Sequence, residues 1–565
     1  MAKETQARGM TREEKKVIIA SSAGTVFEWY DFFLYGSLAA MIGDQFFSSF
    51  PEATRNIFAL LAFAAGFLVR PLGALVFGRL GDTIGRKYTF LMTIMLMGVS
   101  TFLVGFLPGY GVIGAAAPII LICLRIFQGL ALGGEYGGAV AYVAEHAPHN
   151  KRGAFTSWIN STATLGFLLS LVVIMVARLS VGEQAFKEWG WRLPFIFSIV
   201  LLIISAYIRL QMSETPAFRK IKEEGRQSNA PIMEAFGEWR NFKNAFATFI
   251  GIASGLTVIF YTAHFYTLFF LQNVLRVDMF TSTLLVAASL IIGSFAYVFF
   301  GKLSDRIGRK PVILTGFVLA AVSTFPAYHF ITETANPQLD AAQKATHVRV
   351  TADPSDCSFQ FNPAGTSKFT SSCDVAKALL TKNSVNYDVV YEANVIPAKV
   401  HIAGKDIVSY EVTKLTPEEA PKVSSAFAKN ITDALYAAGY PSPEQVNTQI
   451  VKISRAADML HPQALKIIIV LSIMVVFSAM AYAPAAAAMA ELFPTRIRYT
   501  GMSFPYNLGT GWFGGLMPAA AYAMSTHSGN IYFGLWYPVV IVAISFISVL
   551  LIIPETSGKD IFADD

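Results

Sequence analysis

Gly78-Arg-Leu-Gly-Asp-Thr-Ile-Gly-Arg-Lys87 returns later in the chain, little changed, as Gly301-Lys-Leu-Ser-Asp-Arg-Ile-Gly-Arg-Lys310. Both copies lie between long apolar runs. Each combines a carboxylate, a turn glycine and paired cations at the same offsets, which is typical of a tight charged turn between two hydrophobic segments. Internal self-similarity of this kind indicates a duplicated architecture. The repeat therefore predicts two related halves with the turn in matching places.

The composition is that of a membrane protein. Of 565 residues, 54% are hydrophobic and 15% charged, with 46 Phe and a mean hydropathy of +0.49. A soluble domain carries more charge and fewer apolar residues. Apolar windows of about 20 residues, the length that crosses a bilayer, predict about twelve spanning helices. We place these spans at residues 17–43, 56–79, 88–108, 116–144, 154–179, 191–211, 244–271, 280–301, 311–331, 464–491, 499–524 and 531–553.

The cations of the connecting loops predict the orientation. Cytoplasmic loops carry an excess of Lys and Arg, and here these residues cluster in alternate loops, which include both repeated turns. Both termini and both turns are therefore expected on the cytoplasmic side of a bacterial inner membrane. Residues 1–16 are polar, and the following apolar run is too long for a signal peptide, so this segment is expected to be retained. The loops account for the net charge of +6, so a nucleic-acid partner is not expected.

One region between spans nine and ten is not membrane-like, and the topology places it outside the cytoplasm. Alternating runs at 347–351 and 398–403 predict strands, and 417–439 predicts an amphipathic helix, so the insert is expected to be a small α+β domain. We assign it no function. The expected divisions are an N-terminal six-helix bundle (1–211), a cytoplasmic linker (212–243), helices seven to nine (244–331), the insert (332–463), and helices ten to twelve with a short tail (464–565).

The insert holds two of the three cysteines, Cys357 and Cys373, while Cys123 lies in span four. A disulfide between the first two fits an oxidising exterior, and closing a loop of that size would stabilise the insert by about 3 kcal/mol. Two free thiols are the alternative. No pattern in the chain suggests a metal site or a cofactor.

The two turns resemble the signature loops after helices two and eight of the major facilitator superfamily. Four further segments resemble its metabolite:H⁺ symporter family, which includes α-ketoglutarate, shikimate, citrate and proline/betaine permeases. These segments are 27–36 (FEWYDFFLYG), 70–73 (RPLG), 125–138 (RIFQGLALGGEYGG) and 491–501 (ELFPTRIRYTG). The resemblance implies an all-α membrane fold of twelve helices in two six-helix bundles. It does not cover the insert, and the chain ends soon after span twelve, unlike the osmosensory proline/betaine branch with its C-terminal coiled coil.

Span one contains the strongest candidate for proton coupling. Glu28, Asp31 and Tyr35 lie at i, i+3 and i+7, so they share one helical face. A carboxylate inside a membrane is costly unless it faces a cavity or a partner, and two neighbouring carboxylates each favour protonation of the other. We expect Asp31 to load and release a proton, with Glu28 as a second candidate. A satisfied interhelical hydrogen bond is the alternative role for either one.

Span four offers a complementary charge. Arg125, Gln128 and Glu135 lie on one stripe of the helix. The planar guanidinium of Arg125 suits a substrate carboxylate, or it pairs with Glu135 or Asp31 when the site is empty. A permanent structural ion pair is the alternative. Arg70 is expected near the cytoplasmic end of span two, where it either binds substrate or extends towards the membrane surface.

The second half contributes aromatic and polar candidates. Tyr261 and Tyr266 in span seven are expected to line the substrate route. His264 between them is expected either to relay a proton or to pack as a satisfied residue. Asn507 in span eleven is a candidate substrate contact among glycines that mainly favour close helix packing.

The repeated turns are expected to form a latch that holds the two bundles together on the cytoplasmic side. Their aspartates can accept hydrogen bonds from helix N-termini, and their glycines allow sharp turns. Satisfying and anchoring a short loop is the alternative role. The expected gate residues are Gly78, Asp82, Gly85, Arg86, Lys87, Gly301, Asp305, Gly308, Arg309 and Lys310.

Together these features predict a monomeric transporter, not an enzyme, that imports protons with a small organic metabolite by alternating access. A carboxylate, such as a di- or tricarboxylate, is expected because of the membrane arginines. A zwitterionic osmolyte such as proline or betaine is the first alternative. A nutrient receptor that does not transport is the second.

Overall fold

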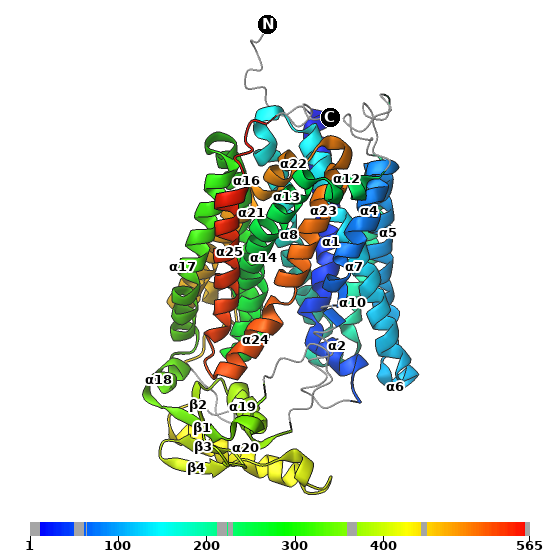
Figure 1. The fold of residues 1–565 in the computed structure, drawn as a ribbon. Helices are drawn as coiled ribbons and strands as arrows, with labels where there is room; N and C mark the ends of the chain where they lie inside the picture. The colour runs from blue at the N-terminus through cyan, green and yellow to red at the C-terminus, as the bar shows by residue number, and fades with distance from the viewer. Residues whose placement is uncertain are drawn as a thin grey trace.

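The computed structural model describes residues 12–49, 62–63, 65–211, 223, 230–358, 370–441 and 449–559. A long helical body carries a small domain at one end, and Figure 1 shows that domain below helices of the second half. We call this the insert end. The opposite end, which holds both repeated turns, is the turn end.

The first half is a bundle of long helices. α8 packs against α1, α10 against α5, and α7 against both α4 and α5. The first-half helices are α1 (Arg12–Ser37), α2 (Ala39–Phe46), α4 (Arg70–Thr83), α5 (Arg86–Phe106), α6 (Tyr110–Ile113), α7 (Ala116–His146), α8 (Arg152–Val181), α9 (Glu183–Ala185), the π-helical η2 (Phe186–Gly190) and α10 (Arg192–Leu210).

The second half repeats this plan with a more irregular seventh span. That span alternates between α- and π-helical turns: α13 (Trp239–Ala247), η3 (Thr248–Ser254), α14 (Gly255–Tyr261), η4 (Thr262–Tyr266), α15 (Thr267–Phe269) and η5 (Phe270–Val274). Single π turns are frequent at functional sites. The other helices are α12 (Pro231–Gly237), α16 (Met279–Ile307), α17 (Arg309–Ala335), α21 (Pro462–Tyr482), α22 (Ala485–Leu492), α23 (Arg498–Gly509), the π-helical η10 (Thr510–Gly514), α24 (Met517–Ser528) and α25 (Trp536–Ile552).

Two close helix pairs join the halves. α8 of the first half packs along α16 of the second, and α4 packs along α23. Both interfaces depend on glycine. A Cβ on Gly81 of α4 would lie 2.1 Å from the Tyr499 ring of α23, and one on Gly301 of α16 would lie 2.5 Å from the carbonyl oxygen of Gly153 in α8.

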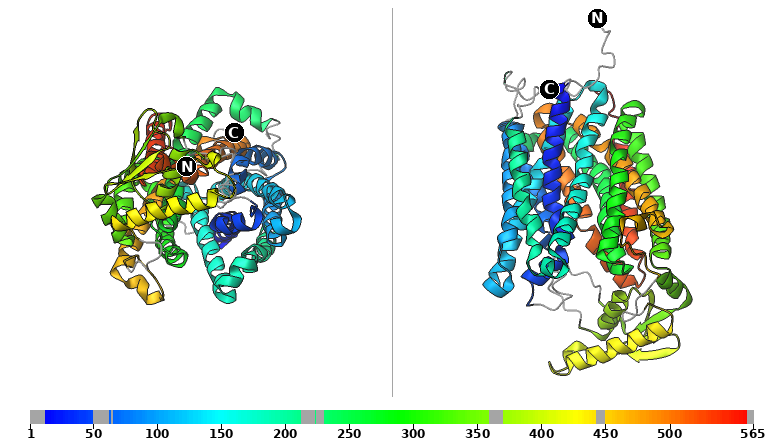
Figure 2. Two further views of the ribbon diagram at one scale, coloured as in Figure 1. Left: turned by 90° about the horizontal axis from the view of Figure 1, so that it is seen from below. Right: turned by 180° about the vertical axis from the view of Figure 1, so that it is seen from behind.

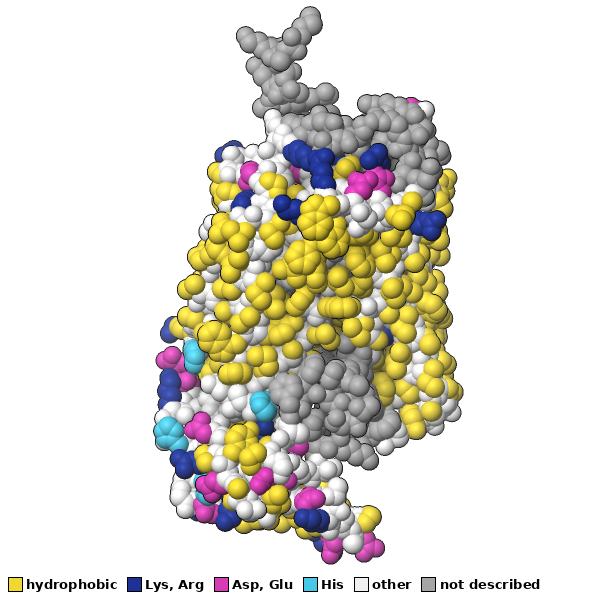
Figure 3. Space-filling view, viewed as in Figure 1, with side chains coloured by type: hydrophobic (Ala, Val, Ile, Leu, Met, Phe, Trp, Pro, Cys, Tyr) yellow, Lys and Arg dark blue, Asp and Glu magenta, His cyan; other side chains and the backbone are white. Residues whose placement is uncertain are grey.

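Nine of the described helical segments are long and apolar enough to cross a membrane. The other three expected spans coincide with α1, α4 and α23 to α24, which carry more polar residues or lie partly outside the described ranges. Figure 3 shows a broad hydrophobic band across the visible face of the helical body, with Lys, Arg, Asp and Glu side chains above it and mixed charges on the insert below. The total of twelve spans stays a prediction.

The insert is an α+β domain, as its sequence pattern indicates. Its mixed sheet has the order β2-β1-β3-β4, with β1 parallel to β2 and the other pairs antiparallel. The predicted strands correspond to β1 and β3, and the predicted amphipathic helix to α20. Its elements are α18 (Pro337–Ala345), β1 (Val348–Ala352), α19 (Ser372–Lys382), β2 (Tyr387–Tyr391), β3 (Lys399–Ile402), β4 (Lys405–Val408) and α20 (Ala420–Ala437). A disulfide joins Cys357 to Cys373, whose Cα atoms are 5.1 Å apart.

The insert docks on the second half, and Figure 2 shows it on that side from below and from behind. The Tyr387 amide donates to the Gly529 carbonyl at 2.8 Å, in the turn after α24. The Ile531 amide donates to the Asn386 side chain at 3.0 Å, and the Ile453 amide to the Thr281 hydroxyl at 2.9 Å. The insert therefore contacts the ends of several second-half helices.

Candidate transport site

Arg70 lies in the interior between the two halves. Its side chain is fully buried, and its Nε donates to the Asn507 side chain of α23 at 3.1 Å. The rings of Trp29, Phe32 and Phe67 surround its Cζ at 5.6 to 5.9 Å, and the two terminal nitrogens have no hydrogen-bond partner among the described residues. The expectation that Arg70 extends towards the membrane surface is therefore wrong, because α4 begins at this residue deep inside the body.

Arg125 of α7 is the second buried guanidinium of this region. Its Nη1 donates to Gln128, whose amide in turn donates to the Thr101 hydroxyl at 2.9 Å. The Cζ lies 4.4 Å from the Tyr35 ring and 4.9 Å from the Phe32 ring, while Nε and Nη2 have no hydrogen-bond partner within the part of the chain that the structure describes. Cation–π contacts hold the charge without neutralising it.

The expected pairing of Arg125 with Glu135 is wrong. Glu135 forms an ion pair with Arg209 instead, and the same guanidinium nitrogen lies 3.2 Å from Glu28. Thr93 also donates to Glu135, at 3.2 Å. Arg209 is the last charged residue of α10, and the sequence analysis did not select it. An arginine inside the apolar run of span six was the signal that could have identified it.

Asp31 is separate from this cluster, although it lies one helical turn from Glu28. Its side chain is buried and contacts the Thr101 hydroxyl, and its Oδ1 has no hydrogen-bond partner in the described ranges. Thr101 therefore lies between Asp31 and the pair formed by Gln128 and Arg125. The structure thus connects the expected proton carrier to the expected substrate contact through one hydroxyl.

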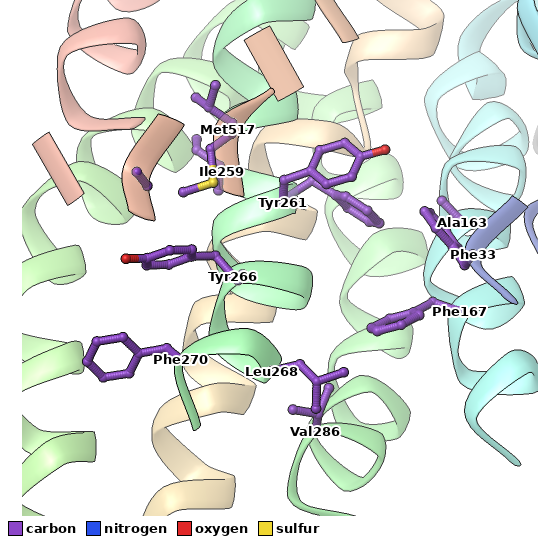
Figure 4. Packing of buried hydrophobic residues seen from close by; sticks show 14 of the residues in the cluster. Phe33, Ala163, Phe167, Ile259, Tyr261, Tyr266, Leu268, Phe270, Val286 and Met517 are labelled. Atoms are coloured by element: carbon purple, nitrogen blue, oxygen red, sulfur yellow. The ribbon is translucent and has the colours of Figure 1, made fainter. Parts of the chain in front are cut away.

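The two tyrosines of span seven point in different directions. Figure 4 shows the Tyr261 ring on the side of Phe33 and Phe167, and the Tyr266 ring on the opposite side of the helix. Tyr261 packs edge-on against Phe67 at 5.6 Å and lies close to Arg70. Tyr266 instead lines a small cavity between the second half and the insert, together with Tyr387 of the insert. The structure therefore brings Tyr261, but not Tyr266, to the central arginines.

His264 is fully buried, and both of its ring nitrogens have partners. Nδ1 lies 2.8 Å from the Phe260 carbonyl, and Nε2 lies 3.2 Å from the Thr164 hydroxyl on α8. The Thr164 hydroxyl also lies 3.1 Å from the Tyr297 hydroxyl. This arrangement joins the two halves and matches the packing alternative for His264.

Asn507 also ties the halves together. It accepts from Arg70, while its Nδ2 donates to the Gly133 carbonyl at 2.8 Å and to the Ser503 carbonyl at 2.9 Å. Its side chain is fully buried. A substrate at Arg70 would therefore also meet the Asn507 amide.

The aspartates of the two turns bind helix N-termini of the opposite half. The Asp82 carboxylate accepts from the amide and hydroxyl of Thr500, at 2.9 and 2.7 Å, in the first turn of α23. Asp305 accepts from the amides of Gly153 and Ala154 in the first turn of α8, both at 2.8 Å. A carboxylate at a helix N-terminus is favoured by the helix dipole. The two contacts are related by the internal repeat.

The other residues of the turns also have matching roles. Gly85 and Gly308 adopt φ values of +130° and +104°, which side chains with a Cβ rarely tolerate. Lys87 donates to the Leu210 carbonyl at 3.0 Å, and Lys310 to the Leu550 carbonyl at 2.7 Å, so each caps the last helix of its own half. A Cβ on Gly78 would lie 3.2 Å from Thr500.

Arg309 pairs with Asp305 at 2.7 Å and with Glu491 at 3.3 Å. The side chain of its counterpart Arg86 lies outside the described part of the structure. Lys310 also donates to the Ile553 carbonyl at 2.9 Å.

Two crossed ion pairs complete the turn end, and the sequence analysis missed them. Glu145 and Arg152 flank the loop between α7 and α8, and Glu491 and Arg498 occupy the same offsets between α22 and α23. Arg498 bonds Glu145 of the other half at 3.1 Å, and Arg152 lies 3.7 Å from Glu491. The repeated spacing of Glu and Arg was a usable signal. These contacts close the interface between the halves at the turn end.

The fold and the site define a class of protein: a helical membrane protein built from two related halves, with buried charges in its interior and ion pairs that join the halves at the turn end. Among the described residues, no group of three or more His, Cys, Asp or Glu side chains could hold a metal ion.

Comparison with known proteins gives the family. Residues 16–249 and 451–563 match the family described as "Sugar (and other) transporter", and the chain belongs to this family. The computed fold is similar to that of the proton:xylose symporter XylE, with a TM-score of 0.60, 13% identity and 97% of each chain covered.

The sequence relatives include the permeases that the motifs resemble. The proline/betaine transporter of Escherichia coli (strain K12) is 37% identical over 329 residues, which are 56% of this chain and 65% of that protein. The matched region thus spans just under two thirds of this relative. The α-ketoglutarate permease of the same strain is 33% identical over 329 residues, 58% of this chain and 74% of the permease. The shikimate transporter of the same strain is 35% identical over 323 residues, which are 56% of this chain and 72% of that transporter.

Proposed function

We propose that this protein is a proton-coupled symporter that imports a small carboxylate. The observation that carries the proposal is the pair of buried guanidiniums, Arg70 and Arg125. Among the residues that the structure describes, each has donors without a hydrogen-bond partner, and neither has a carboxylate partner. A buried charge without a partner is costly. Aromatic rings offset part of this cost, and a bound carboxylate would offset more through bidentate hydrogen bonds.

The turn end is the cytoplasmic end in this proposal, and the insert lies on the periplasmic side of a bacterial inner membrane. The loop cations support that orientation. With the latches of Asp82 and Asp305 closed, the cytoplasmic route is blocked. Import requires these contacts to break as the two bundles rock around the central arginines.

Asp31 carries the coupled proton. Its contact with Thr101, and through Thr101 with Gln128 and Arg125, links its charge to the substrate site. Protonation of Asp31 in the outward-facing state removes a negative charge that competes with the substrate for the nearby guanidinium. Both ring nitrogens of His264 are engaged, so the histidine holds the halves together and takes no part in the relay.

A zwitterionic osmolyte is the second candidate, and the aromatic rings around Arg70 favour it. Trp29, Phe32 and Phe67 could hold a quaternary ammonium group while an arginine holds the carboxylate. A proline/betaine transporter is among the relatives. A receptor that binds without transport is the alternative of another class.

Uptake into proteoliposomes distinguishes these candidates. Purified protein is reconstituted, an inward proton gradient is imposed, and labelled di- and tricarboxylates, shikimate, proline and betaine are offered in turn. We expect gradient-driven accumulation of a carboxylate. Accumulation of betaine alone would select the osmolyte, and binding without accumulation of any solute would select the receptor.

The Asp31→Asn variant tests the carrier in the same vesicles. It should lose accumulation but retain exchange of substrate across the membrane, because exchange needs no net proton movement. Glu183→Gln, at the surface of the insert end, is the matched control. Accumulation that survives in Asp31→Asn would exclude Asp31 as the proton carrier.

A further inference from the structure

Glu28, Glu135 and Arg209 form a buried cluster between Asp31 and the turn end, which we call the inner triad. They come from three helices, α1, α7 and α10, and each side chain is at most 5% exposed. Arg209 Nη2 serves both carboxylates, and the Glu28 carboxyl is within hydrogen-bond reach of Glu135. No described residue forms a hydrogen bond with Arg209 Nε, Arg209 Nη1 or Glu28 Oε2.

The packing around Arg209 is built for its guanidinium. A Cβ on Gly24 would lie 2.9 Å from Nη2 and 3.0 Å from Nε. The Phe90 ring of α5 covers the other side, 4.6 Å from Cζ. A larger residue at position 24 would displace the arginine, so the glycine and the charge form one unit.

The charges of the inner triad do not balance. Two ionised carboxylates and one guanidinium leave one negative charge in excess, and a single proton makes the cluster neutral. A buried site favours neutrality, because an uncompensated charge in a low dielectric is costly. The other charged or titratable groups that face the triad are Asp31 on α1 and Tyr499 on α23, while Thr25 and Thr93 donate to Glu135.

The inner triad also touches the gate. Tyr499, directly before the Thr500 that Asp82 holds, donates from its hydroxyl to the carbonyl of Gly134, the neighbour of Glu135. A Cβ on Gly81 in the first repeated turn would lie 2.1 Å from the Tyr499 ring. Opening of the gate therefore removes Tyr499 from the helix turn that carries Glu135, and admits water there.

We propose that the inner triad is a second proton site, which receives the proton from Asp31 and releases it to the cytoplasm when the gate opens, with Arg209 as its positioning residue. This inference rests on the proposed function. The proton leaves the Asp31 carboxyl, binds a carboxylate oxygen of Glu28 one helical turn away, and then passes to water, so that Asp31 and the triad both end ionised. Arg209 keeps the capacity of the triad at one proton.

Charge counting gives the test. Glu135→Gln leaves Glu28 and Arg209 neutral together, so this variant has no place for a proton. The double variant Glu135→Gln/Arg209→Gln restores the single excess negative charge on Glu28. We measure substrate accumulation under a proton gradient and protons moved per substrate, with a pH-sensitive dye inside the vesicles. Substrate exchange reports whether each variant is folded.

The proposal expects accumulation to fall roughly tenfold or more in Glu135→Gln, within the range of typical coupling effects, with exchange retained. The double variant Glu135→Gln/Arg209→Gln should regain most of the lost accumulation, and Arg209→Lys should retain coupling. A merely structural role predicts the reverse order, because Glu135→Gln leaves the Glu28–Arg209 pair intact while the double variant strands a buried Glu28. If Glu135→Gln also loses exchange, the variant is not folded and cannot test the site. Glu28→Gln then takes its place, because it leaves the triad with the same net charge.

Two failures are distinguishable. Wild-type vesicles that accumulate no solute under a gradient would overturn the proposed function and the inner site with it. If Glu135→Gln and Glu28→Gln both accumulate substrate to the wild-type level, with an unchanged number of protons moved per substrate, the inner site alone would be overturned. Glu183→Gln serves as the charge-matched surface control.

Discussion

Arg70 and Arg125 have different surroundings, and this difference assigns them different tasks. Arg70 bonds Asn507 in the opposite half, whereas the contacts of Arg125 with Gln128, Tyr35 and Phe32 lie within its own half. A substrate held at Arg70 therefore senses both halves, which alternating access requires. Arg125 is linked through Gln128 and Thr101 to Asp31, the proposed proton carrier.

Arg70→Lys should weaken substrate binding while the protein stays folded. Lysine keeps the charge but loses the planar fork that binds a carboxylate through two hydrogen bonds. We expect a loss of about 1.5–3 kcal/mol, or roughly one to two orders of magnitude in Kd. Equilibrium binding of a labelled substrate to detergent-solubilised protein measures it. Arg178→Lys is the matched control, and an unchanged Kd in Arg70→Lys would remove Arg70 from the site.

The latches explain why the turns are repeated as whole elements. Each half supplies one aspartate and one helix N-terminus, so the gate consists of two copies of one contact. The crossed ion pairs of Glu145 with Arg498 and of Glu491 with Arg152 obey the same symmetry. In the proposed rocking motion all of these contacts break together, so we expect the gate to open cooperatively.

Asp305→Asn should shift the protein towards the state that is open at the turn end. The variant loses the charge that favours the N-terminus of α8, a loss of about 1–2 kcal/mol, or roughly tenfold in population. Spin labels at Arg79 and Lys302 in a Cys123→Ser background report the separation of the halves. We expect a new, longer distance. Asp388→Asn in the insert is the control, and an unchanged distance distribution would reject the latch.

The insert depends on a glycine at its docking surface. Gly529 has a φ of +78°, and a Cβ there would lie 2.0 Å from the Tyr387 carbonyl oxygen. Gly529→Val should therefore separate β2 from α24 and speed hydrogen exchange of the Tyr387 amide roughly tenfold or more. Gly404→Val is the matched control, because Gly404 has a φ of +81° but open space around it. Equal exchange in both variants would mean that backbone strain, not the contact, is responsible.

Docking of the insert should also weaken in acid. His527, beyond the expected end of span eleven, lies 3.5 Å from Lys377 of α19. Burial, and then the charge of Lys377, lower the pKa of His527 below its ordinary value. Docking therefore favours neutral His527, so its stabilisation is present above about pH 6.5 and is lost as the pH falls through the lowered value. Exchange of the Tyr387 amide, corrected for intrinsic rates, should rise below pH 6.5 in wild type but not in His527→Gln.

At the scale of the whole molecule, local patterns predicted the elements and missed the long-range pairs. Apolar windows, the repeated turns and the alternating runs of the insert are local signals. Arg209 pairs with residues on two other helices, and no spacing along span six reveals this. The direction of Tyr266 also escaped prediction, although regular helical spacing contains it: five residues at about 100° each place Tyr266 roughly 140° from Tyr261 around the helix.

The central claim is that a proton and a carboxylate move together through one site, and proton flux driven by substrate tests it most directly. Proteoliposomes without a pH gradient, loaded with a pH-sensitive dye, are given an outward excess of the carboxylate that the uptake assay identifies. We expect the interior of the vesicles to acidify as the substrate enters, and no acidification in the Asp31→Asn variant. Substrate that enters wild-type vesicles while the internal pH stays constant would contradict proton-coupled symport, because it would show transport without a coupled proton.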